Sequence, residues 1–87
     1  MVSKEFTIND ELGMHMRPAS LLSQMAAKYQ SNVTVKYNGK DLNAKSVMLL
    51  MTALIKYNSV IEVVCDGTDE EEALAAISEF IESGMGD

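Results

Sequence analysis

The sequence has 87 residues, of which 47% are hydrophobic and 23% charged, and its formal net charge is -6. This length suits one compact unit with a modest core, and we expect residues 1–87 to form a single domain. The negative net charge argues against nucleic acid as a binding partner, because proteins that bind phosphate backbones usually present a basic face. The apolar stretches are too short to span a bilayer, we find no secretory signal, and Cys65 has no second cysteine to pair with. We therefore expect a cytoplasmic protein that binds another protein or a small ligand.

The first half of the chain predicts a strand, a helix and a hairpin. Phe6 and Ile8 lie on one side of a short strand, which a polar loop, NDELG, follows. From Ala19 onward, apolar residues recur at helical spacing over about three turns, with Ser23 on or near the polar face. The segment NVTVKYNGKDLNA alternates apolar and polar residues around an Asn-Gly pair, which tolerates the positive φ angles of a tight turn. It therefore predicts two antiparallel strands.

The second half predicts a short helix, a strand and a longer helix. Ser46 stands where an N-cap would begin the helix in KSVMLLMTALI. The segment SVIEVVCDG is rich in β-branched residues and ends at Gly67, which indicates an interior strand. Thr68 and Glu71 have the spacing of a capping box, and Gly84 marks the end of the last helix. The whole order predicts an α+β fold of two layers, with three helices on one face of a sheet.

The segment GMHMRPAS contains the only histidine and the only proline of the chain, where the first loop meets the first helix. Helix N-termini attract anions, and an imidazole near neutral pH has a lone pair that can attack phosphorus. Arg17 would add positive charge, and Pro18 suits the first turn of a helix because its missing N–H costs nothing there. The alternative is that His15 is an ordinary surface histidine, and this segment by itself does not decide between the two.

The acidic run DEEE predicts a helix N-terminus rather than a metal site. It lacks the alternating ligands and the central glycine of a calcium loop. The chain also has no glycine-rich nucleotide loop and no spacing typical of metal ligands. We therefore expect neither a metal nor a cofactor.

GMHMRPAS resembles the active-site segment, G-x-H-A-R-P-A, of the HPr family, the histidine-containing phosphocarriers of the bacterial sugar phosphotransferase system. KYNGKDLNAKSVMLLM is similar to a second region of that family, and the likeness continues through the DG turn and the acidic last helix. The resemblance implies an open-faced β-sandwich, in which three helices cover one face of a four-stranded antiparallel sheet. It also implies that His15 is phosphorylated on Nδ1.

The function implied by the resemblance is that of a carrier rather than a free-standing enzyme. A phosphoryl group from phosphoenolpyruvate would reach His15 through enzyme I and pass to an enzyme IIA domain or another sugar-specific enzyme II component. Arg17 would stabilise the phosphoryl group, and Pro18 would fix the helix start. Such transfer needs alignment and positive charge more than acid–base machinery. The alternative is an HPr-like regulatory binding module, which would act through Ser46 and a surface formed by Met48, Leu49 and Met51.

The short helix predicts a docking surface beside a regulatory site. If Val47, Leu50 and Leu54 pack inward, Met48 and Leu49 face outward, and exposed apolar patches often mark partner sites. By periodicity alone these residues could equally complete the core, and the resemblance favours docking. In relatives with this lysine-serine arrangement an HPr kinase phosphorylates the serine, which implies a regulatory phosphate on Ser46 and a surface for a transcriptional regulator. The residues that we expect to dock partners are Met16, Ser20, Met48, Leu49 and Met51.

Some positions depart from the family pattern. Met16 replaces a usual alanine, and both Leu49 and Leu54 stand where relatives often have glycine. Asn58, near another family glycine, can still adopt a left-handed conformation. None of these changes removes His15 or Arg17, and we expect them to affect the choice of partner. We expect the protein to be a monomer.

Overall fold

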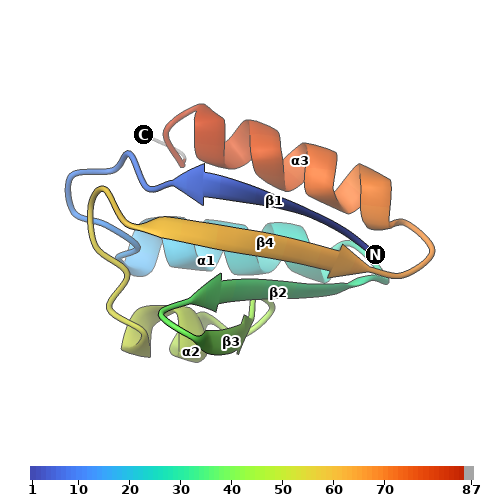
Figure 1. The fold of residues 1–87 in the computed structure, drawn as a ribbon, viewed down its shortest axis with the longest axis horizontal. Coiled ribbons are helices and arrows are strands. Elements are labelled where there is room, and N and C mark those ends of the chain that lie inside the picture. Colours follow the sequence, from blue (N-terminus) through green and yellow to red (C-terminus); the bar gives the residue numbers. More distant parts are fainter. Residues whose placement is uncertain (86–87) are drawn as a thin grey trace.

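The computed structural model describes residues 1–85 and has the predicted order of elements, βαββαβα. Figure 1 shows the chain as a sheet seen face-on with helices behind and beside it. The strands and helices are β1 (Val2–Thr7), α1 (Met16–Ala27), β2 (Asn32–Tyr37), β3 (Lys40–Asn43), α2 (Val47–Thr52), β4 (Val60–Asp66) and α3 (Glu70–Glu82).

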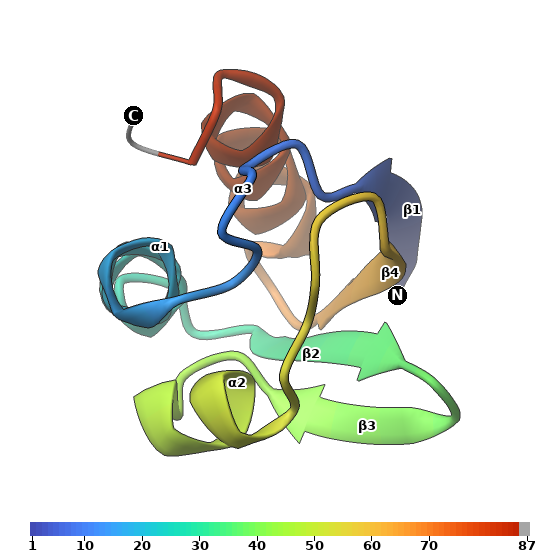
Figure 2. The ribbon, with the colours of Figure 1, turned by 90° about the vertical axis from the view of Figure 1, so that its left-hand side faces the viewer.

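The four strands form one antiparallel sheet in the order β1-β4-β2-β3. The last strand along the sequence is therefore interior, as its β-branched composition predicts, and it pairs with β1 on one side and β2 on the other. Figure 2 shows the three helices on one side of the sheet, while its other face is open. The prediction of an open-faced sandwich is confirmed.

The core lies between the covered face of the sheet and the helices. Alternate residues of β4, namely Ile61, Val63 and Cys65, are buried there because successive side chains of a strand point to opposite faces. Leu22 of α1 and Ile77 of α3 are fully buried against them, and this burial of apolar surface drives the layers together. Within residues 1–85, no helix is both long and apolar enough to cross a membrane.

The hairpin between β2 and β3 has the turn that its sequence predicts. Asn38 and Gly39 have φ angles of 52° and 76°. Two successive positive values characterise the type I′ turn, which matches the twist of the strands it joins.

The N-terminus of α3 differs from the predicted capping box. The N-cap residue is Asp69 rather than Thr68, and the Asp69 side chain makes no capping bond to its own helix. Its carboxylate instead accepts hydrogen bonds from the backbone N–H groups of Gln30 and Ser31, at 2.8 and 2.9 Å, and one from the Ser31 hydroxyl. The prediction was wrong because these long-range donors compete with the local ones.

Two further side chains lie where periodicity did not place them. Ser23 is buried rather than near the polar face, and its hydroxyl donates to the Lys45 carbonyl at 2.8 Å. Leu54 is 70% exposed rather than packed inward, because α2 ends at Thr52 and the helical periodicity stops with it. Leu54 itself has a φ of 55°, in the left-handed region.

Candidate functional site

Two loops at one end of the sheet hold the segment that contains His15. The backbone N–H of Ile8 donates to the Ser59 carbonyl at 2.8 Å, and that of Asn58 donates to the Ile8 carbonyl at 2.9 Å. Further along, the N–H of Met14 donates to the Ile55 carbonyl at 2.8 Å. The loop before α1 is therefore fastened along the loop that precedes β4, which fixes the position from which the helix starts.

His15 is the N-cap residue of α1. Its backbone is extended, and its carbonyl accepts the first helical hydrogen bond from Ala19 at 3.0 Å. The side chain makes no capping bond and is 31% exposed, so part of the ring is accessible from solvent. This placement at a helix N-terminus is the one that the sequence predicts, and it puts the imidazole beside the positive end of the helix dipole.

The buried carboxylate of Asp10 contacts the His15 ring. Asp10 Oδ2 lies 3.2 Å from Nε2, and the Asp10 side chain is only 4% exposed. An ionised carboxylate accepts hydrogen bonds and does not donate them, so this contact favours the tautomer with the proton on Nε2. The lone pair of the neutral ring is then on Nδ1. Sequence reasoning missed Asp10, which lies in the loop NDELG and carries no motif of its own.

The other two predicted residues of the motif lie in the first turn of α1. Arg17 is its second residue and has an exposed side chain, whereas Pro18 is its third residue and is buried. A missing N–H at this position leaves no helical hydrogen bond unmade, as predicted for Pro18. Among residues 1–85, no three histidine, cysteine, aspartate or glutamate side chains are arranged so that they could hold a metal ion.

Exposed apolar side chains lie on α2 and in the loops beside His15. Met48 and Leu49 on α2 are 71% and 42% exposed, as predicted, and Met51 is half-buried. Sequence reasoning missed Leu12, which is 77% exposed in the loop before His15. We define the apolar surface as Leu12, Met16, Met48, Leu49, Met51 and Leu54. A shallow hollow of about 320 Å³ beside the ring is lined by Leu12, Met14, His15, Met16, Met51, Leu54, Ile55 and Lys56.

Hydrogen bonds connect α1 and the residues just after it to Lys45, which lies just before α2. Besides the bond from Ser23 to the Lys45 carbonyl, the Lys45 amine donates to the Tyr29 carbonyl just after α1, at 2.9 Å. The next residue, Ser46, caps α2 as predicted, and its hydroxyl accepts from the Leu49 N–H at 3.3 Å. Ser46 therefore lies at the start of the helix that carries Met48 and Leu49. Ser20, the remaining predicted docking residue, is half-buried on α1.

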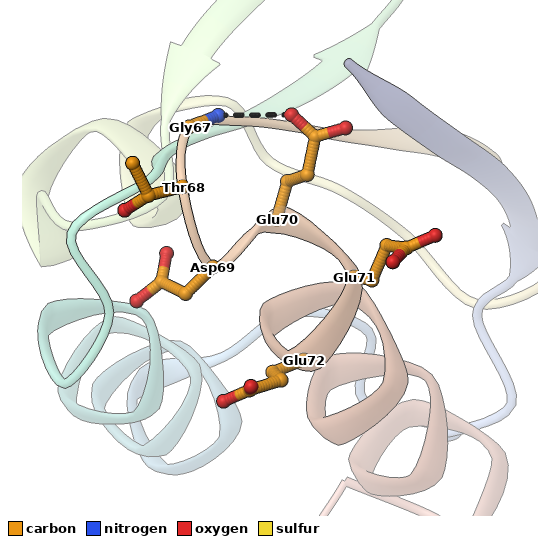
Figure 3. Close-up of a pocket in the computed structure, with 6 residues that line it drawn as sticks. All are labelled: Gly67, Thr68, Asp69, Glu70, Glu71 and Glu72. Carbon is orange, nitrogen blue, oxygen red and sulfur yellow. Dashed lines mark hydrogen bonds between the residues drawn. The ribbon is translucent and has the colours of Figure 1, made fainter.

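An acidic hollow lies at the far end of β4 from these loops. It has a volume of about 410 Å³ and is formed by residues 67–72 (Figure 3). Two of its carboxylates have partners: that of Asp69 accepts the bonds from Gln30 and Ser31, and Glu70 accepts from the Gly67 N–H at 3.1 Å and from the N-terminal amine at 3.0 Å. The bond from the N-terminal amine lowers the pKa of Glu70. The acidic run thus lies at the start of a helix, as the sequence predicts.

Comparison with known families identifies one match. Residues 2–83 match the family described as the PTS HPr component phosphorylation site. The chain is similar to HPr from Thermoanaerobacter tengcongensis, with 37% identity over 100% of this chain and 98% of that one, and a TM-score of 0.95. It is also similar to the histidine-containing phosphocarrier protein of Mycoplasma, with 36% identity, 97% coverage of both chains and a TM-score of 0.91.

Crh from Bacillus subtilis, a catabolite repression protein found as a domain-swapped, intertwined dimer, is a third similar structure. It has 31% identity, 97% coverage of both chains and a TM-score of 0.76. Carriers and a regulatory protein thus both share this fold. Because the family match spans residues 2–83 and these relatives align over nearly their whole length, the chain belongs to the HPr family of phosphotransferase-system phosphocarriers.

Proposed function

We propose that the protein accepts a phosphoryl group on Nδ1 of His15 from phosphorylated enzyme I and passes it to an enzyme IIA domain. The observation that carries this proposal is the position of His15: a half-buried imidazole at the N-cap of α1, with Nε2 against Asp10. The contact directs the lone pair to Nδ1, and the helix N-terminus favours the negative charge of the incoming group.

Arg17 acts on the phosphoryl group by charge. Its exposed side chain starts from the first turn of the same helix, within the N-terminal region that attracts anions. Since a guanidinium stabilises charge but forms no bond to phosphorus, Arg17→Ala slows transfer in both directions without abolishing it. An unchanged rate would remove Arg17 from the mechanism.

The direct experiment is phosphorylation with enzyme I and labelled phosphoenolpyruvate. We expect acid-labile label on the wild-type protein and none on His15→Ala, which remains folded because His15 lies at a helix edge and contributes little packing. Label that persists on a folded His15→Ala protein would refute the assignment. Adding an enzyme IIA domain should then remove the label from the wild type.

The apolar surface is the site at which these partners dock. Leu12, Met16 and Leu54 are exposed and line the hollow beside the ring, so a partner that covers them also reaches His15. Ser46 lies beside this surface and can receive a second, regulatory phosphate from an HPr kinase. The resulting negative charge at the start of α2 would oppose apolar docking of enzyme I and favour a different partner, such as a transcriptional regulator.

A regulatory binding module is the second candidate, and the similarity to Crh favours it. Such a module would act through Ser46 and the exposed side chains of α2 and would not depend on His15. Enzyme I separates the two candidates, because only the carrier gains acid-labile phosphate. We expect a monomer in either case. Light scattering at several protein concentrations tests this, and a mass of twice 9.5 kDa would instead show a dimer.

A further inference from the structure

We infer that Asp10 is a positioning residue for phosphoryl transfer, because it holds the His15 ring in the tautomer that can react at Nδ1. This inference rests on the proposed function of His15. Asp10 lies five residues before His15, and its contact with the ring comes from the fold of the loop rather than from the motif GMHMRPAS.

Each oxygen of the Asp10 carboxylate has a separate partner. Oδ1 accepts a hydrogen bond from the Leu12 N–H at 2.9 Å, and Oδ2 lies 3.2 Å from Nε2 of His15. The Asp10 carbonyl also accepts from the Gly13 N–H at 2.8 Å, which closes the loop into a turn. Since its side chain is only 4% exposed, few water molecules can replace the carboxylate as the partner of Nε2.

This contact matters to the chemistry because only one nitrogen of a neutral imidazole has a free lone pair. In the transfer step the lone pair of Nδ1 forms the bond to phosphorus. The bond between phosphorus and the phosphohistidine nitrogen of the donor protein breaks, and its electron pair returns to that nitrogen. The proton on Nε2 stays in place, and the positive charge that develops on the ring lies against the Asp10 carboxylate.

Substitution by the amide isostere should reverse this arrangement. In Asp10→Asn the Leu12 N–H still requires an acceptor, so the amide oxygen takes the place of Oδ1. The amide nitrogen then faces Nε2 and donates to it, which leaves the proton of the neutral ring on Nδ1. That tautomer has no lone pair at the reacting nitrogen. Asp10→Ala imposes neither tautomer, because it removes both contacts.

The experiment compares the wild type, Asp10→Asn and Asp10→Ala by two readouts. The chain has one histidine, so [15N]histidine labelling gives one pair of ring signals, whose chemical shifts in mildly alkaline buffer report which nitrogen carries the proton. We expect the proton on Nε2 in the wild type, on Nδ1 in Asp10→Asn, and distributed between them in Asp10→Ala. The second readout is the rate of phosphorylation by enzyme I, which should fall at least about tenfold in Asp10→Asn and less in Asp10→Ala.

Which of the two variants is phosphorylated more slowly distinguishes a positioning role of Asp10 from a purely structural one. If Asp10 only closed the turn, Asp10→Asn would resemble the wild type, because it keeps an acceptor for the Leu12 N–H, and Asp10→Ala would be the more damaged. That order, or a tautomer unchanged by Asp10→Asn, would overturn the inference. A wild-type protein that accepts no phosphate would overturn the proposed function instead, while the ring signals would still test whether Asp10 sets the tautomer.

Discussion

Gly13 and Ile55 approach so closely that no side chain fits between them. A Cβ atom on Gly13 would lie 2.4 Å from the Ile55 carbonyl oxygen, the same oxygen that accepts the Met14 N–H. Gly13 also has a φ of 71°, which other residues rarely adopt. This contact joins the loop that carries His15 to the loop before β4, so the position of the reacting ring depends on a glycine two residues away.

We expect Gly13→Ala to destabilise the fold and to slow phosphorylation of His15. Gly39→Ala is the matched control, because Gly39 has a φ of 76° but nothing within 4 Å of the added Cβ. In urea unfolding the control should lose about 1–2 kcal/mol from backbone strain alone, and Gly13→Ala about 3 kcal/mol or more. Equal losses would show that the Ile55 carbonyl moves aside easily.

Leu54→Gly should stabilise the protein while weakening docking. Leu54 has a left-handed φ of 55° and an exposed side chain, so glycine relieves strain and loses little packing. We expect a gain of about 0.5–1 kcal/mol in the free energy of unfolding, after the extra chain entropy of glycine is subtracted. Asn58→Gly, at a φ of 67°, should gain less because asparagine tolerates this conformation. A less stable Leu54→Gly protein would contradict the argument.

Polar substitution of Met48 and Leu49 should weaken docking without unfolding the protein. We expect Met48→Gln with Leu49→Gln to raise the KM for phosphorylation by enzyme I about tenfold or more. The melting temperature should change little, because both side chains are exposed. Leu50→Ala on the same helix is the contrasting control: it removes a fully buried side chain and should cost about 2–5 kcal/mol of stability. A large fall in melting temperature for the double variant would place Met48 and Leu49 in the core.

Substitutions can distinguish the structural role of Ser46 from its regulatory role. Ser46→Ala removes the acceptor for the Leu49 N–H and should cost about 1 kcal/mol of stability. Ser46→Asp keeps an acceptor at the N-cap, so it should remain near wild-type stability but accept phosphate from enzyme I more slowly. Treatment with an HPr kinase and ATP should label the wild type but not Ser46→Ala. If Ser46→Asp is as fast as the wild type and the kinase adds no phosphate, Ser46 is only a helix cap.

The stability should fall in acid as Asp69 becomes protonated. The hydrogen bonds from the Ser31 hydroxyl and the Gln30 N–H lower the pKa of Asp69 below its ordinary value of 3.8. In acid the unfolded state therefore binds more protons than the folded state. The contribution of Asp69 to the free energy of unfolding is complete above pH 3.8, and it is lost as the pH falls through the pKa that Asp69 has in the folded protein.

Unfolding free energies measured from neutral to strongly acidic pH would check this dependence. Both Asp69→Asn and Ser31→Ala should reduce the fall of the unfolding free energy in acid. Ser3→Ala on β1 is the matched serine control and should leave it as in the wild type. An unaltered acid dependence in Asp69→Asn would assign the loss to other carboxylates.

The sequence predicts the elements and their order because each has a local signal. Asn38–Gly39 specifies its turn, and Ser46 specifies the start of α2. What it does not predict depends on contacts between distant segments. Asp69, rather than the expected Thr68, is the N-cap of α3, and its carboxylate bonds to the end of the α1–β2 loop. Ser23 is buried, and its hydroxyl donates to a carbonyl of another segment.

The same distinction applies to the candidate site. His15 is found from its neighbours in the sequence, and its placement at a helix N-terminus follows from Pro18. Asp10 belongs to a polar loop and is recognised only once the turn closed through Gly13 brings its carboxylate to the ring. Leu12 also lies in a loop, and its neighbours in the sequence do not show that it belongs to the apolar surface.

The interior position of β4 also constrains how the chain folds as it is synthesised. β1 is made first, but its only partner in the sheet is β4, which begins at Val60. Until β4 has left the ribosome, only β2 and β3 can pair with each other. During that time the backbone groups of β1 form hydrogen bonds with water. Closure of such distant pairs is slow compared with local folding, so we expect β1 to pair with β4 after the β2–β3 hairpin has formed.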